Sequence, residues 1–157
     1  GRRWDARGTS RGGPEGRRSV TLTRRQARTR YHPPMPSIAK TAEFTVTEKR
    51  SKFVALAAPA STLAEAKKVV AKRSRKHHKS RHNCWACRVR DDEGRLVEQA
   101  RDDGEVGRPG MKLLELLRGA ELEGVIVVSR YFGGIKLGPA GVGRAFRAAG
   151  EGALDIL

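Results

Sequence analysis

The sequence has no long apolar run and only two cysteines among its 157 residues. No run approaches the roughly 20 apolar residues that a membrane-spanning helix needs, and no segment resembles the apolar centre of a secretory signal. We therefore expect a soluble protein with no membrane partner. Because two cysteines cannot build a disulfide framework, we also expect a reducing compartment.

The two cysteines, Cys84 and Cys87, form a CxxC pattern, and His77, His78 and His82 lie close upstream. This pattern is half of a zinc site, but the sequence has no second CxxC and no HxxxH to complete it. The segment has the composition of a strand, on which residues three apart point to opposite faces. We therefore expect ordinary strand cysteines, no metal site and no cofactor, with zinc as the alternative.

Acidic residues are also scarce: 17 stand against 33 lysines and arginines, which gives a net charge of +16. Residues 1–36 hold ten arginines and two acids, and residues 67–81 hold eight basic residues and no acid, so each segment carries +8. The rest of the chain is nearly neutral. Two separate basic segments are the electrostatic feature to explain.

Residues 1–36 are rich in Arg, Gly and Pro, with apolar residues too scattered to form a core face. We expect a disordered basic arm, followed by a single folded domain over residues 37–157. Such an arm suits a tail that folds onto RNA or the remnant of an organellar targeting segment, and a merely solvated tail is the simplest alternative. The candidate RNA contacts in the arm are Arg17, Arg18, Arg24 and Arg25.

Hydrophobic periodicity predicts both strands and helices in the folded part, which indicates an α+β class. Strands are predicted at 42–48 and 52–57 (as two strands or one interrupted strand), 82–90, 95–99 and 124–132. Helices are predicted at 62–81, 108–119 and 144–154.

The helix predicted at 62–81 opens with Thr62 and Glu65 at the spacing of a capping box. Its polar face and the turn after it carry the second basic segment. Two or three cations near a helix C-terminus complement its dipole, but eight without an acid favour contacts with phosphates. The candidate RNA contacts in this segment are Lys72, Arg73, Arg75, Lys76, Lys79 and Arg81.

The densest acidic group of the folded part is "DDGE" at 102–105. Clustered carboxylates can hold magnesium or act as acid and base, but acids just ahead of a helix also satisfy its free N–H groups. No partnered His or Ser/His arrangement accompanies them, so we expect no catalytic residue and a protein that is not an enzyme.

A glycine-rich stretch, "RYFGGIKLGPAGVGR" at 130–144, follows an apolar strand. It fails the P-loop pattern at Pro139 and Ala140, and it fails the dinucleotide pattern because Phe146 stands where a third glycine is needed. With so few side chains, this loop suits a close approach to a phosphate backbone, with Arg130, Lys136 and Arg144 beside it. Tight turns and strand-to-helix packing explain the glycines equally well.

Several of these segments together closely resemble the IMPACT family: "SKF" at 51–53, "HN" at 82–83, "DDGE", "VVSRYFGGIKLG" at 127–138 and "GVGRAF" at 141–146. The resemblance covers about residues 43–153. It implies that the chain is a lone IMPACT-like domain preceded by a basic arm. The motif residues are His82, Asn83, Asp102, Asp103, Gly104, Glu105, Phe132, Gly133, Gly134 and Gly138.

The resemblance implies a two-layer α+β sandwich with helices on one face of a four-stranded sheet, like the second domain of a small-subunit ribosomal protein. It also implies a link to translation. Eukaryotic members dampen a starvation-responsive initiation-factor kinase by competing for its coactivator, whereas bacterial members have no settled activity and are suspected nucleic-acid binders. The family has no established catalytic residues.

These observations lead to three hypotheses. The first is an RNA-binding protein of the translation apparatus, a component or assembly factor of a ribosome or mitoribosome, with rRNA and neighbouring ribosomal or assembly proteins as partners. On this hypothesis the location is mitochondrial, or otherwise cytoplasmic. The second is a protein-binding regulator of translation that uses the DDGE and glycine-loop surface, and the third is a metal-dependent hydrolase at that same surface.

Overall fold

The computed structural model describes residues 35–157, so the predictions for Arg17, Arg18, Arg24 and Arg25 lie outside the described residues. The elements follow the chain in this order: β1 (Ala42–Glu48), β2 (Ser51–Ala58), α2 (Leu63–Lys76), β3 (His82–Arg90), β4 (Leu96–Arg101), α3 (Pro109–Ala120), β5 (Gly124–Tyr131) and α4 (Gly138–Ile156).

The five strands form one sheet in the order β1-β2-β5-β3-β4, and all neighbouring strands run antiparallel. The first two strands are separate and form a hairpin. Its two-residue turn places Lys49 at φ 45° and Arg50 at φ 71°, the left-handed conformation of a turn whose twist matches the strands. The last strand in the sequence, β5, lies at the centre of the sheet, between β2 and β3.

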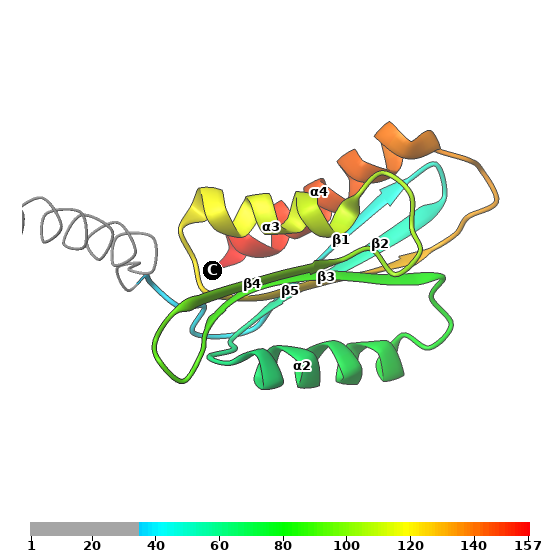
Figure 1. The fold of residues 1–157 in the computed structure, drawn as a ribbon. Coiled ribbons are helices and arrows are strands. Elements are labelled where there is room, and N and C mark those ends of the chain that lie inside the picture. Colours follow the sequence, from blue (N-terminus) through cyan, green and yellow to red (C-terminus); the bar gives the residue numbers. More distant parts are fainter. Residues whose placement is uncertain (1–34) are drawn as a thin grey trace, which may run out of the picture. The chain divides into compact units, whose positions relative to one another are not determined.

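Helices cover both faces of this sheet, with α3 and α4 on one face and α2 on the other (Figure 1). One core cluster includes Phe53, Ile126, Leu113 and Phe146, and a second one includes Trp85, Val127 and Ala66 of α2. The predicted α+β class is therefore confirmed, but the sheet has five strands instead of four and helices on both faces instead of one. The reason is that the central strands are apolar on both sides, as the run Val125–Val128 shows, so each side needs a cover.

The helix α2 begins as predicted, because the Thr62 hydroxyl accepts a hydrogen bond from the Glu65 N–H at 3.1 Å. The Glu65 carboxylate accepts in return from the Ser61 N–H at 2.7 Å, one residue before the cap. The helix ends at Lys76 rather than at residue 81. Its basic side chains are exposed except Arg73, which is buried.

The two cysteines are buried on opposite faces of β3, as the strand spacing predicts. Cys84 packs in the cluster under α3 and α4, and Cys87 packs in the cluster under α2. Burial raises the pKa of both thiols, so they stay protonated at neutral pH. Both therefore behave as core residues, and their thiols diverge.

Of the described helices, none is both long enough and apolar enough to cross a membrane.

A three-residue ion cluster ties the edge strand β4 to its neighbours. Glu98 of β4 faces Arg88 of β3 and accepts from its Nε at 2.8 Å, and it accepts from Nη2 of Arg118 in α3 at 2.6 Å. Hydrogen bonds from Arg118, together with the charges of Arg118 and Arg88, hold the pKa of Glu98 below its ordinary value. Arg88 is buried, so this carboxylate neutralises a charge that has little access to water.

The substitution Glu98→Gln is expected to lower the free energy of unfolding at neutral pH by about 1–2 kcal/mol, because Arg88 loses its charged partner. The folded-state pKa of Glu98 is depressed, so its contribution is present above the unfolded pKa, near 4.5, and is lost as pH falls through the folded value. Urea denaturation should therefore show the variant and the parent converging as the pH falls through the folded-state pKa of Glu98. Asp155→Asn, on the exposed last turn of α4, is the control and should leave the pH profile unchanged; a constant gap at all pH values would contradict this account.

Candidate functional site at one end of the sheet

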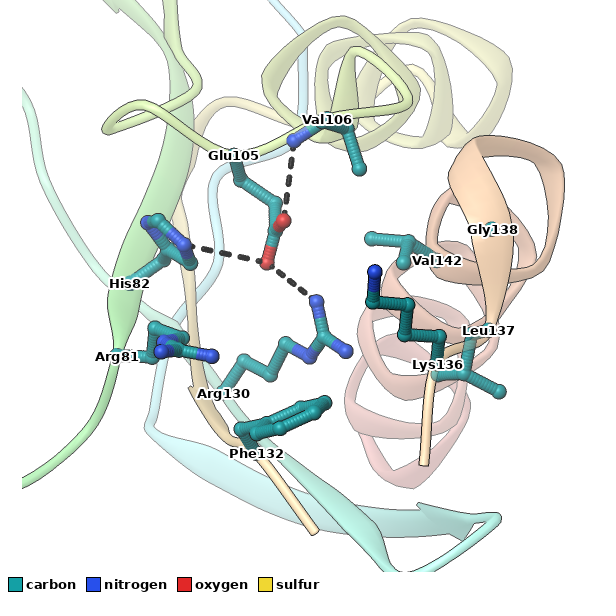
Figure 2. Close-up of a pocket in the computed structure, with 10 residues that line it drawn as sticks. All are labelled: Arg81, His82, Glu105, Val106, Arg130, Phe132, Lys136, Leu137, Gly138 and Val142. Carbon is teal, nitrogen blue, oxygen red and sulfur yellow. Dashed lines mark hydrogen bonds and ion pairs between the residues drawn. The ribbon is translucent and has the colours of Figure 1, made fainter. Parts of the chain in front are cut away.

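Three segments that are distant in sequence meet at one end of the sheet: the start of β3, the loop between β4 and α3, and the loop between β5 and α4 (Figure 1). They enclose a cavity of about 370 Å³. Its walls, drawn in Figure 2, are formed by Arg81, His82, Glu105, Val106, Arg130, Phe132, Lys136, Leu137, Gly138 and Val142. Most of the sequence motifs singled out above therefore gather around one cavity.

The two aspartates of the DDGE motif accept hydrogen bonds from backbone N–H groups. Asp102 accepts through Oδ1 from the N–H of Gly110 at 2.8 Å, in the first turn of α3. Asp103 accepts through Oδ2 from the N–H of Asn83 at 2.8 Å, and its carbonyl oxygen is 2.7 Å from Nδ1 of His82. Because a carbonyl only accepts, Nδ1 of His82 carries a proton. Asp102 therefore satisfies a free N–H group at the start of α3, which is one of the roles that the sequence suggested for these acids.

The glutamate of the motif forms a buried ion pair. Glu105 Oε2 is 2.9 Å from Nη1 of Arg130, and the two side chains are only 4% and 7% exposed. The other carboxylate oxygen accepts from the N–H of Val106 at 3.0 Å, and Nε2 of His82 lies 3.8 Å from Oε2. The Arg130 guanidinium also lies 5.5 Å from the ring centroid of Phe53 and 5.6 Å from that of Phe132. This pair forms the floor of the cavity.

The substitution Glu105→Ala is expected to lower the free energy of unfolding by about 3 kcal/mol, because it leaves the Arg130 charge buried and unpaired. Replacing both partners, as in Glu105→Ala with Arg130→Met, should recover most of the loss, since no buried charge remains. Urea denaturation of the parent and both variants measures this. Equal stability of the parent and Glu105→Ala would show that the pair does not support the fold.

The glycines bring loops together. A Cβ on Gly133 would stand 2.1 Å from the carbonyl oxygen of Arg50, and one on Gly107 would stand 2.3 Å from that of Pro139. The Gly133 N–H also donates to the hydroxyl of Ser51 at 3.2 Å. Gly133 thus docks the β5–α4 loop on the β1–β2 hairpin, and Gly107 brings the β4–α3 loop against α4. Both glycines therefore serve packing, which for Gly133 is one of the two interpretations that the sequence left open.

The glycine-rich stretch is also shorter as a loop than predicted. The helix α4 begins at Gly138, not at residue 144, with Pro139 in its first turn. Proline suits a first helical turn, because its missing N–H would have no partner there. Glycine is a poor helix former, so the sequence alone favoured a loop, and packing against the sheet overrode that preference. Gly138 itself has φ 75°, a left-handed conformation.

Two of the candidate RNA contacts are buried in ion pairs. Arg73 is 4% exposed and donates to Glu43 Oε2 at 2.8 Å, and Arg130 is 5% exposed and pairs with Glu105. Burial alone would raise the pKa of Glu43, but the Arg73 charge and hydrogen bond, with Lys76 nearby, hold that pKa below its ordinary value. Neither guanidinium is displayed at the surface for a phosphate.

The remaining described candidates are exposed: Lys72, Arg75, Lys76, Lys79, Arg81, Lys136 and Arg144. The structure brings Arg81 and Lys136 to the same cavity, next to Arg130. Arg144 lines a separate hollow with Glu48 and Lys49.

Sequence reasoning missed the apolar part of the cavity wall. Val106, Leu137 and Val142 line it, and Val106 is exposed. One feature of the sequence could have indicated this wall: an aliphatic residue inside a polar, glycine-containing loop. Val106 and the exposed Ile135 are both residues of this kind. These three aliphatic residues, two from loops and one from α4, form a wall only once the chain is folded.

Comparison with known proteins identifies the family. The model of the Impact N-terminal domain matches residues 49–154, so the chain belongs to this family. It is 34% identical over 119 residues to the IMPACT family member YvyE of Bacillus subtilis (strain 168), an alignment that covers 74% of this chain and 54% of YvyE. The chain thus spans about half the length of this relative.

Two solved structures share the fold. One is the crystal structure of a hypothetical protein, with a TM-score of 0.72 and 29% sequence identity over 77% of this chain and 60% of the other. The second is the two-domain translational regulator Yih1, with a TM-score of 0.50 and 24% identity over 80% of this chain and 52% of that one. At that identity, the likeness to Yih1 concerns the fold alone.

Proposed function

We propose that this protein acts in translation as an RNA-binding component or assembly factor of a ribosomal particle, with rRNA as its main partner. Membership of the IMPACT family supports the link to translation, because the eukaryotic members described above dampen an initiation-factor kinase. The basic surface of α2 supports RNA as the ligand. A mitochondrial location remains a prediction from the Arg-rich composition of residues 1–36.

The observation that carries this proposal is that α2 from Ala66 onward and the turn after it display cations without acids; the one carboxylate of the helix, Glu65, lies in its first turn. Between residues 66 and 90 the sequence has no Asp or Glu. The basic side chains of this segment other than Arg73 are exposed, and we call them the α2 basic surface: Lys67, Lys68, Lys72, Arg75, Lys76, Lys79 and Arg81. Among the described residues, only Lys76 of this set has an ion-pair partner, Glu43 at 3.7 Å.

The architecture keeps this surface accessible. The helix α2 lies on one face of the sheet, whereas α3 and α4 lie on the other (Figure 1). At 100° per residue, Lys67, Lys68, Lys72, Arg75 and Lys76 fall within one half of the helix surface, opposite the buried Ala66 and Arg73. Such a surface attracts phosphates and releases their counterions without reading base sequence. The basic arm of residues 1–36 would add a second contact with the RNA.

A protein-binding regulator of translation is the second candidate, because apolar side chains are exposed beside the cavity. Val106, Phe132 and Ile135 are each more than 40% exposed. Exposed apolar patches with a polar rim mark sites of protein interaction. No comparable observation favours the hydrolase hypothesis, since both aspartates hold backbone N–H groups and Glu105 holds Arg130.

The triple substitution Lys68→Gln, Lys72→Gln and Arg75→Gln is expected to weaken binding to single-stranded RNA and to lower the salt slope, log Kd against log salt, by about 2, since each phosphate contact contributes about 0.7. Fluorescence anisotropy with a labelled RNA at several salt concentrations measures both quantities. The matched control removes three exposed arginines elsewhere: Arg101→Gln, Arg108→Gln and Arg147→Gln. Equal effects of the two triples would mean that net charge, not the α2 basic surface, determines binding.

A second experiment tests the link to translation. We expect the tagged full chain to co-sediment with ribosomal particles from its own cell extract, and to leave them after RNase treatment or at high salt. The triple variant of α2 should shift toward the top of the gradient. Sedimentation in a complex that resists RNase would favour the protein-binding regulator instead.

A further inference from the structure

The cavity at the end of the sheet combines an apolar interior with a cationic rim. Val106, Leu137 and Val142 contribute aliphatic wall, and Phe132 contributes an aromatic one. Arg81 and Lys136 are exposed at the opening. At about 370 Å³, the cavity falls within the size range of small-molecule sites.

The charges around the cavity favour an anion. Its only carboxylate, Glu105, is engaged by Arg130, and His82 lies 3.8 Å from the same oxygen. The Nε of Arg130 is buried and has no hydrogen-bond partner in the described part of the chain. Figure 2 shows one terminal nitrogen of Arg130 bound to Glu105 and the other turned toward the side of Phe132 and Lys136. After the Glu105–Arg130 pair is formed, Arg81 and Lys136 remain as positive charges without a carboxylate in the cavity.

The ring of Phe132 provides a planar surface at this cationic rim. It is 41% exposed, and the Arg81 guanidinium lies 4.8 Å from its centroid. The Arg130 guanidinium lies 5.6 Å from the same centroid. Aromatic rings and guanidinium planes are the surfaces on which proteins stack unpaired RNA bases.

The cavity is also continuous with the α2 basic surface. Arg81 belongs to both, and its N–H donates to the carbonyl oxygen of Arg130 at 2.7 Å. A strand of RNA whose phosphates follow the basic side chains to the end of α2 would therefore arrive at the opening of the cavity.

We propose that the cavity binds one unstacked nucleotide of single-stranded RNA. The base lies between Phe132 and the wall of Val106 and Leu137, and Arg81 and Lys136 hold its phosphate. This inference rests on the proposed RNA-binding function and adds to it a site that distinguishes single-stranded RNA from duplex RNA, because only an unpaired base leaves its stack.

The test compares two phenylalanines of equal exposure in the full chain. Phe132 and Phe44 are both 41% exposed, but Phe44 lies on the edge strand β1, away from the cavity lining. Phe132→Ala is expected to weaken binding of a short unstructured single-stranded RNA roughly tenfold, which is within the range for removing one stacking platform. It should leave the affinity for a fully paired RNA hairpin nearly unchanged, and Phe44→Ala should change neither.

A second variant tests the cavity without changing position 132, so that a local loss of structure in Phe132→Ala cannot be mistaken for a loss of binding. Val106 is 51% exposed, so Val106→Trp can be accommodated while its indole fills the opening of the cavity. It should weaken single-stranded binding and spare the hairpin, as Phe132→Ala does. Circular dichroism of each variant checks the fold.

The outcomes separate this inference from the proposed function. If the α2 triple variant weakens both RNAs while Phe132→Ala and Val106→Trp weaken neither, the nucleotide site is overturned and RNA binding stands; the cavity is then left to an anionic protein segment. If the parent protein binds neither RNA, both proposals fail. Selective loss of single-stranded binding in both cavity variants supports the site.

Discussion

The buried ion pair between Glu105 and Arg130 is the interaction on which the candidate site at the end of the sheet depends. It joins the β4–α3 loop to the end of the central strand β5, and these two segments lie close together because β5 is placed between β2 and β3. Both side chains are almost fully buried, so neither charge is stable without the other. Around this pair the aspartates fix the loop to β3 and α3, and Phe132 covers the guanidinium. The pair lines the cavity together with residues of the β4–α3 and β5–α4 loops.

The fold divides the molecule into a basic side and a motif-bearing end. The sheet is apolar on both faces, so α2 must cover one face while α3 and α4 cover the other. A helix that covers a sheet alone presents its whole outer half to solvent, and here that half carries cations. The loops at one end of the sheet are left to form the cavity. Arg81, at the end of the basic segment and at the rim of the cavity, is where the two features meet.

Much of the fold followed from local patterns. The capping box at Thr62, the divergence of Cys84 and Cys87 on β3 and the helix after the DDGE motif were all predicted, because each depends on neighbours within a few residues. The cover on the second face of the sheet and the early start of α4 at Gly138 were not. Both depend on packing between elements. At Gly138 this packing outweighs the low helix propensity of glycine, and on the second face of the sheet it adds a layer that the family resemblance did not imply.

The sequence alone predicts most of the strands and helices, the family motifs and the two segments that carry the net charge, because periodicity, spacing and composition are properties of the chain. It did not determine which cations are available. Arg73 and Arg75 stand two residues apart in one basic run, yet the first is buried against Glu43 and the second is exposed. The difference depends on tertiary contacts, since the carboxylates that neutralise Arg73 and Arg130 lie 30 and 25 residues away in the chain. The same holds for the cavity, whose apolar wall and cationic rim come from segments that no local pattern connects.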